Sequence, residues 1–177
     1  MSDTIILVAN NDEARKLSSK DLKCDILITG EGRSNVIRTL AGCLKEGIIT
    51  DDKTIINVGY VGAKGIEPGT VVKIGAVEPY ISSETIKENC IFLKNIKANL
   101  SCQGCFTADN FVKASDDRVA DLPKECVIDM ELYYIALMFP YVNSYKIVSD
   151  ELNYDEYTEA SFEESWNKVK EYIKENL

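Results

Sequence analysis

Val127-Ile128-Asp129-Met130-Glu131 and Ile147-Val148-Ser149-Asp150 are the two stretches of sequence that decide the fold. Each is a short, largely β-branched run that ends abruptly in acids. Such a run is typical of a buried parallel strand, and polar residues at the carboxyl end of a strand face the ligand crevice of an open α/β sheet. The two stretches therefore predict acids from two strand ends in one crevice, where they could transfer protons or bind hydroxyl groups.

Further apolar runs of strand length alternate with helical patterns along the chain. We expect strands over 4–9, 25–29, 54–58, 71–77, 98–102, 126–130 and 145–148. Helical spacing of apolar residues predicts helices over 33–44 and 131–139, and a last helix that opens with a Ser161-x-x-Glu164 capping box. This alternation predicts an α/β fold with a mixed, largely parallel twisted sheet flanked by helices, and 177 residues predict a single domain over 1–177.

Composition narrows the functional class. A net charge of −9 argues against nucleic acid or an anionic membrane as partner, and no apolar stretch approaches membrane-spanning length. Without a leader-like N-terminus, the expected location is cytoplasmic. The six cysteines are expected to be free thiols, and the single Cys102-x-x-Cys105 pair is interpreted as chance spacing rather than a metal or redox site.

The chain contains no histidine, so proton transfer must run through carboxylates, Lys, Tyr, Cys or water. Candidate groups lie in turns expected after the strands, at 9–13, 30–34, 57–63 and 106–112. Three of these turns also have a structural interpretation: helix capping for the first, a tight turn for the third, and core packing of an aromatic ring for the fourth. The second has glycines before a helix, which suit an anion, but its Glu31 would repel phosphate.

Taken in order, these segments resemble the nucleoside phosphorylase and nucleosidase superfamily, and most of all its 5′-methylthioadenosine/S-adenosylhomocysteine nucleosidases. Segment 107–112 is similar to the family's Ser-Gly-Asp-x-Phe-Ile segment, and 57–62 to its Asn-x-Gly-x-Ala-Gly turn. Asp129-Met130-Glu131 and Ser149-Asp150 carry the most specific likeness. The resemblance covers about 5 to 150 and implies a nucleoside phosphorylase-like fold.

The resemblance also implies roles for residues around the base and the sugar. Asp150 would donate a proton to purine N7, and Ser149 would orient that acid. Glu131 would accept hydrogen bonds from the ribose hydroxyls, with Met130 packed under the sugar. Phe111 would stack on the purine.

Four more positions complete the implied site. Backbone groups of Val112 would bind the purine edge, and the turn containing Val61 and Gly62 would let backbone approach the substrate. Glu13 falls where the family has the acid that orients or deprotonates the attacking water. Lys146 stands where the nucleosidases usually carry an arginine near that water.

Hydrolysis of the N-glycosidic bond of a purine nucleoside is the function that this set implies. Such cleavage passes through an oxocarbenium-like sugar and needs an acid on the leaving base, a negative environment near the sugar and a positioned nucleophile. Asp150, Glu131 and Glu13 would supply one each, with no cofactor and no metal. The resemblance further implies a homodimer.

Three alternatives stay open. A phosphate-dependent purine nucleoside phosphorylase would need cations, but the family's Gly-Asp-Pro-x-Arg loop is absent, Glu31 opposes phosphate, and only Arg33 and Lys64 remain as candidates. A degenerate, non-catalytic nucleoside-binding protein is favoured if Tyr60, which replaces a small residue, and the shortened region over 77–99 close the pocket. A purely structural α/β domain would leave the acids as helix caps.

Overall fold

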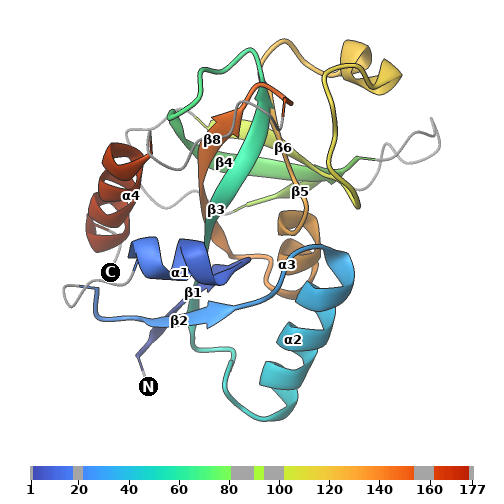
Figure 1. Cartoon of the computed structure of the whole chain (residues 1–177). Coiled ribbons are helices and arrows are strands. Elements are labelled where there is room, and N and C mark those ends of the chain that lie inside the picture. Colours follow the sequence, from blue (N-terminus) through green and yellow to red (C-terminus); the bar gives the residue numbers. More distant parts are fainter. Residues whose placement is uncertain (1, 18–21, 81–89, 94–101, 154–161, 176–177) are drawn as a thin grey trace.

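Eight strands, four α-helices and one 3-10 helix make up the described part of the computed structural model, which comprises residues 2–17, 22–80, 90–93, 102–153 and 162–175. In chain order (Figure 1) they are β1 (Thr4–Val8), α1 (Asn11–Leu17), β2 (Asp25–Ile28), α2 (Arg33–Lys45), β3 (Thr54–Lys64), β4 (Val71–Pro79), β5 (Ile91–Phe92), β6 (Cys102–Thr107), η1 (Asp117–Asp121), β7 (Cys126–Asp129), α3 (Leu132–Met138), β8 (Asn143–Asp150) and α4 (Glu163–Glu175).

The sheet is mixed and mostly parallel. Its strand order is β2-β1-β3-β7-β6-β4-β5, and β8 pairs with both β3 and β4, so that β3, β7, β6, β4 and β8 form a closed ring. β3 pairs with β7, and β4 with β5 and β8, in antiparallel fashion, whereas the other pairs are parallel. The predicted fold class is thereby confirmed, while the closure of part of the sheet was not foreseen.

β3 is the strand that organises the sheet. The prediction that it ends near 58 and is followed by a turn over 57–63 is wrong, because β3 continues to Lys64. Continuous parallel pairing with β8 satisfies its backbone, with one irregularity between Val61 and Gly62. Gly62 is paired with Ile128 of β7 and with Asp150 of β8. The two acidic strand ends therefore meet on either side of β3, although β7 runs opposite to β3.

Helices cover the sheet on two sides (Figure 1). One apolar cluster joins the sheet to α2 and α3 through residues such as Leu40 and Ile135. A second cluster contains Trp166, Val169 and Ile173 of α4, the positions at which helical spacing predicted a buried face. None of the helices in the part of the chain that the structure describes is both long and apolar enough to cross a membrane.

The remaining predicted elements agree with the structure in part. The strand expected over 98–102 lies outside the described residues except for its last position. The capping residue Ser161 also lies outside them. β6 lies just C-terminal to that expected strand, and β5 was not predicted. The thiols of Cys24, Cys43, Cys90, Cys105 and Cys126 are free.

Candidate active site

A cavity of about 440 Å³ opens where β3, β7 and β8 meet, beside α1 and the segment after β6. Nine of the ten predicted site residues line it, namely Glu13, Val61, Gly62, Phe111, Val112, Met130, Glu131, Ser149 and Asp150. The tenth, Lys146, lies behind the wall of the cavity rather than in it. Further lining residues are Ala9, Asn10, Asp12, Glu31, Tyr60, Asn110, Ile128, Asp129 and Leu152.

Asp150, at the end of β8, is held by the turn that follows it. Its Oδ1 accepts the backbone N–H of Asn153 at 3.0 Å, and only 3% of the residue is exposed. The Ser149 hydroxyl lies 2.6 Å from Asp150 Oδ2 and 3.0 Å from the carbonyl oxygen of Val61. A protonated Asp150 can donate to Ser149, which then donates to Val61, whereas an ionised Asp150 accepts from Ser149. The arrangement therefore accommodates both states of a proton donor.

Glu13 points from α1 to β3 and is 4% exposed. The two oxygens of its carboxylate accept separate backbone N–H groups, from Ala9 at 2.8 Å and from Tyr60 at 3.0 Å. Burial raises its pKa, while those hydrogen bonds and the charge of Lys146 oppose the rise. The Asn10 side chain caps the helix by accepting the N–H groups of Asp12 and Glu13. A carboxylate fixed in this way and with a raised pKa can take up a proton from water.

Glu131 is the residue directly before α3, and it lines the cavity. Its Oε1 accepts the Gly32 N–H at 2.8 Å, which links α3 to the glycine turn before α2. Gly32 has a φ of 76°, a left-handed conformation that glycine adopts without strain. Burial, followed by the charge of Asp129, raises the pKa of Glu131 to about 7, with Lys146 opposing. Its second oxygen, Oε2, carries no protein hydrogen bond among those found in the described part of the chain.

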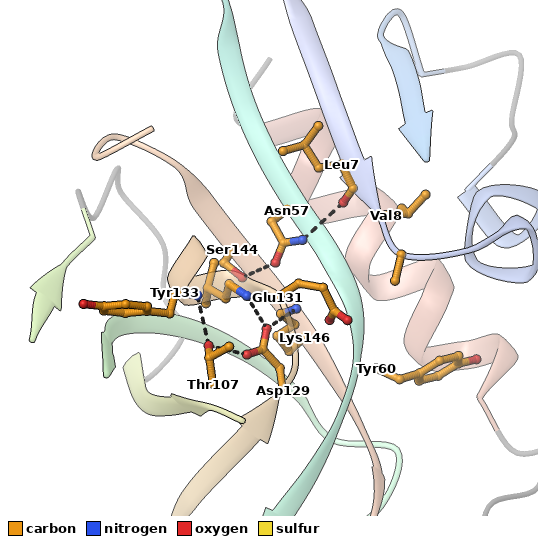
Figure 2. A network of polar contacts seen from close by, with 12 residues as sticks. Leu7, Val8, Asn57, Tyr60, Thr107, Asp129, Glu131, Tyr133, Ser144 and Lys146 are labelled. Carbon is orange, nitrogen blue, oxygen red and sulfur yellow. Dashed lines mark hydrogen bonds and ion pairs between the residues drawn. The ribbon is translucent and has the colours of Figure 1, made fainter. Parts of the chain in front are cut away.

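Asp129, the last residue of β7, anchors a buried polar network that Figure 2 shows. Its Oδ2 lies 2.9 Å from the ammonium of Lys146 on β8 and accepts the Leu132 N–H at 2.9 Å. Its Oδ1 accepts the Thr107 hydroxyl at 2.6 Å, and Thr107 in turn accepts the Tyr133 N–H at 2.9 Å. Asp129 and Thr107 thus supply the N-terminal hydrogen bonds of α3, which Glu131 itself does not.

The segment after β6 contributes two apolar residues, Phe111 and Val112, to the lining of the cavity. Val112 is buried in a small cluster with Ala108, Ile128 and Leu152. Phe111, by contrast, leaves 42% of its surface exposed although it lines the cavity. An exposed aromatic ring at a cavity wall offers a flat face on which a heteroaromatic ligand can stack.

Tyr60 is the residue that was predicted to restrict the cavity. Its ring packs against Phe162 and Trp166 of the C-terminal region, with ring centroids 5.6 and 5.4 Å away. Its hydroxyl accepts the indole N–H of Trp166 at 2.6 Å. Tyr60 therefore lines the cavity while its ring leans on α4, and the cavity persists beside it.

The cavity is strongly acidic. Asp12, Glu13, Glu31, Asp129, Glu131 and Asp150 line it, and no lysine or arginine is among its described lining residues. Arg33 instead forms an ion pair with Asp109 at 3.3 Å, and Lys64 donates to the carbonyls of Val119 and Leu122 at 2.7 and 2.9 Å. Across the described ranges, no three of these acids converge closely enough to hold a metal ion. The site is thus suited to proton transfer and to hydroxyl binding rather than to anion binding.

Sequence reasoning missed that Thr107 and Asp129, which also lines the cavity, supply the hydrogen bonds at the start of α3. Each is the last residue of its strand, so the strand-end rule that singled out Asp150 could have found them. The contacts between Asp129 and Lys146 had no local signal, since the two residues lie on different strands.

Comparison with known proteins yields matches in structure only. The sequence has no significant match among protein-family models or among curated protein sequences. A Helicobacter pylori nucleosidase, an aspartate-to-asparagine mutant with 5′-methylthioadenosine in its active site, superposes with a TM-score of 0.75 and 12% identity, covering 100% of both chains. Futalosine hydrolase of Helicobacter pylori gives a TM-score of 0.73 and 12% identity, with 98% of this chain and 97% of that chain covered.

A Chlamydia trachomatis nucleosidase mutant bound to methylthioadenosine is also similar, with a TM-score of 0.68 and 16% identity over 99% of this chain and 95% of that chain. Coverage is nearly complete in each comparison, so the likeness extends over the whole arrangement of elements rather than over one motif. At these identities it is the fold that is shared. The chain has the fold of these nucleosidases, which is the fold that the resemblance in sequence implied.

Proposed function

We propose that the protein hydrolyses the N-glycosidic bond of a purine nucleoside of the methylthioadenosine or S-adenosylhomocysteine type. The observation that carries this proposal is the convergence of three buried carboxylates on one cavity, each from a different element and each held by a different set of donors. Hydrolysis of such a bond requires three separate functions of this kind.

The reaction then proceeds as follows. Asp150 donates its proton to purine N7, and the electron pair of the bond between C1′ and N9 passes to the base, which leaves neutral. The sugar becomes oxocarbenium-like, and Glu131 binds its hydroxyls through the oxygen that Gly32 does not occupy. Glu13 accepts a proton from water as the water oxygen bonds to C1′. The products are the free base and the reducing sugar.

Similar structures support the substrate class. Two of the neighbours reported above contain methylthioadenosine, in both cases in an aspartate-to-asparagine mutant. In our proposal Asp150 is the corresponding acid, so that Asp150→Asn would bind the nucleoside without cleaving it. Phe111 would stack on the purine, with backbone groups of Val112 at its edge, and Met130 under the sugar.

Hydrolysis is favoured over phosphorolysis by the charge of the cavity. A phosphate nucleophile carries negative charge and would face acids without a neighbouring lysine or arginine among the described lining residues. The two cations that a phosphorylase could have used, Arg33 and Lys64, are engaged elsewhere. Water, which is neutral, meets no such repulsion.

Base release tests the proposal directly. The protein is incubated with methylthioadenosine, S-adenosylhomocysteine, adenosine and inosine, with and without phosphate, and the free base and sugar products are separated. We expect phosphate-independent release of base. Release that requires phosphate and yields a sugar 1-phosphate would replace this proposal by the phosphorylase. Binding of all four nucleosides without release would replace it by a non-catalytic nucleoside-binding protein.

Asp150→Asn provides the residue-level test. We expect loss of most activity with nucleoside binding retained, since the amide keeps its shape but carries no acidic proton. Asp121→Asn, at an exposed position of η1, is the matched control and should leave the rate unchanged. Full activity of Asp150→Asn would remove Asp150 from the mechanism.

A homodimer belongs to the same proposal and rests on the family resemblance. Light scattering after gel filtration measures the mass in solution, and a monomer at all concentrations would exclude it. The cytoplasmic location stays a prediction from the sequence.

A further inference from the structure

Lys146 and Asp129 form the most deeply buried ion pair of the described residues. Only 2% of the lysine side chain and none of the aspartate side chain is exposed, and their charged atoms lie 2.9 Å apart. Burying a pair of charges is costly, and breaking one leaves a charge stranded, so such a pair calls for a functional explanation.

The geometry fixes the ammonium group in place. Asp129 is itself held by the Thr107 hydroxyl and the Leu132 N–H, so the oxygen facing Lys146 cannot rotate away without losing both bonds. In Figure 2 the side chain of Lys146, from β8, meets Asp129, and Glu131 lies beside them. The ammonium therefore sits behind the cavity wall at a fixed position and does not reach a ligand.

The charge of Lys146 affects the pKa of two carboxylates of the cavity. The first is Glu131, just before α3, whose pKa also responds to the charges of Asp129 on β7 and Glu13 on α1. The same carboxylate accepts the Gly32 N–H. Glu13 also feels the charge of Lys146. Cys105 of β6 adjoins the pair, and burial raises the pKa of its thiol well above the ordinary value, so that it stays neutral.

We propose that Lys146 and Asp129 act as a pair of positioning residues: Asp129 pins the ammonium, and together their opposite charges set the pH at which the sugar-binding carboxylate of Glu131 becomes ionised. The inference deepens the proposed function, because an ionised Glu131 is the form that accepts hydrogen bonds from two ribose hydroxyls. Lys146 thus acts through Glu131 and Glu13 rather than by touching water or substrate.

Carboxyl-carbon NMR titration of glutamate-labelled protein without ligand tests this inference. The midpoint of Glu131, assigned by its loss in Glu131→Gln, is compared in the parent, Asp129→Asn, Lys146→Arg and the double variant Asp129→Asn/Lys146→Met. Asp129→Asn removes a like charge and should lower the midpoint by about one pH unit. Lys146→Arg keeps the cation and should leave the midpoint nearly unchanged. The double variant removes both charges and should lower the midpoint by less than Asp129→Asn does, because the raising effect of Asp129 is larger than the lowering effect of Lys146.

Lys73→Met is the matched control, since it removes a buried lysine of β4 whose ammonium lies over the Tyr145 ring. It should leave the Glu131 midpoint in place. Thermal unfolding identifies variants that fail to fold, and the double variant avoids a stranded charge. An unmoved midpoint in Asp129→Asn, or an equal displacement in Lys73→Met, would reduce the pair to a structural role.

The acid limb of kcat/KM for base release provides the second measurement. It should follow the Glu131 midpoint to lower pH in Asp129→Asn, and a displaced NMR midpoint with an unmoved acid limb would disconnect the pair from catalysis. Because the titration is made without substrate, a parent protein that releases no base would refute the proposed function while leaving the electrostatic inference testable.

Discussion

Gly59→Ala is expected to disable the site by displacing a single carboxylate. Gly59 lies in β3 opposite α1, and a Cβ built there would approach Glu13 Oε1 to 2.9 Å, with Cδ and Oε2 both at 3.4 Å. A contact below 3.0 Å is not sustained in a folded protein. Glu13 must therefore retreat from β3, and the first contact it loses is its 3.0 Å hydrogen bond from the Tyr60 N–H.

The size of the effect follows from that bond. A hydrogen bond to a charged group contributes about 1.5–3 kcal/mol. Since about 1.4 kcal/mol corresponds to a factor of ten in rate, kcat/KM should fall about ten- to a hundred-fold if Glu13 positions the attacking water. Displacing a catalytic group by about 1 Å costs a similar factor. The hydrogen bond from Ala9 remains and keeps Glu13 near the site.

The assay is the rate of base release from the best nucleoside substrate, measured alongside thermal unfolding. Gly104→Ala is the matched control because Gly104 also lies in a strand, and a Cβ there would meet no atom within 4 Å. It should retain the parent rate. Equal rates for Gly59→Ala and Gly104→Ala in folded protein would refute the assignment of Glu13 to the reaction.

Three predictions concern stability. The pKa of Glu131 is raised from an ordinary value of 4.5 to about 7 in the folded protein, so the stability that its proton contributes is lost as pH rises between these values; unfolding across pH 4.5 to 7.5 should show a decline of about 3 kcal/mol that Glu131→Gln lacks. Trp166→Phe removes the hydrogen bond to Tyr60 and should lower the free energy of unfolding by about 1–3 kcal/mol in urea titrations. Lys64→Met strands the carbonyls that its ammonium binds and should cost about 1–3 kcal/mol without changing the response of base release to phosphate; a changed response would revive the phosphorylase.

The strand ends were the part of the fold that local sequence could predict. Short β-branched runs strongly favour a buried strand, so the ends of β7 and β8 could be predicted to within two residues. The helical face of α4 was equally clear, because Trp166 and Ile173 recur at helical spacing.

β3 could not be predicted in full, because Asn57 and the two glycines that follow it, Gly59 and Gly62, locally favour a turn. The extended conformation of β3 depends on pairing with β7 and β8, two strands that lie far from it along the chain. The same reason hides the environment of Lys146. A lysine is usually exposed, and only the folded structure reveals that Lys146 is buried and paired with Asp129.

The contact between Tyr60 and α4 has a consequence for anyone who shortens or fuses this chain. No residue of α4 is among the described lining residues of the cavity. Trp166 of α4 nevertheless holds the side chain of Tyr60, and the backbone N–H of Tyr60 holds Glu13. A protein cut before Phe162 would keep every residue of the site and still lose the support of one wall. Boundaries for expression should therefore lie beyond α4, because this helix supports the cavity without lining it.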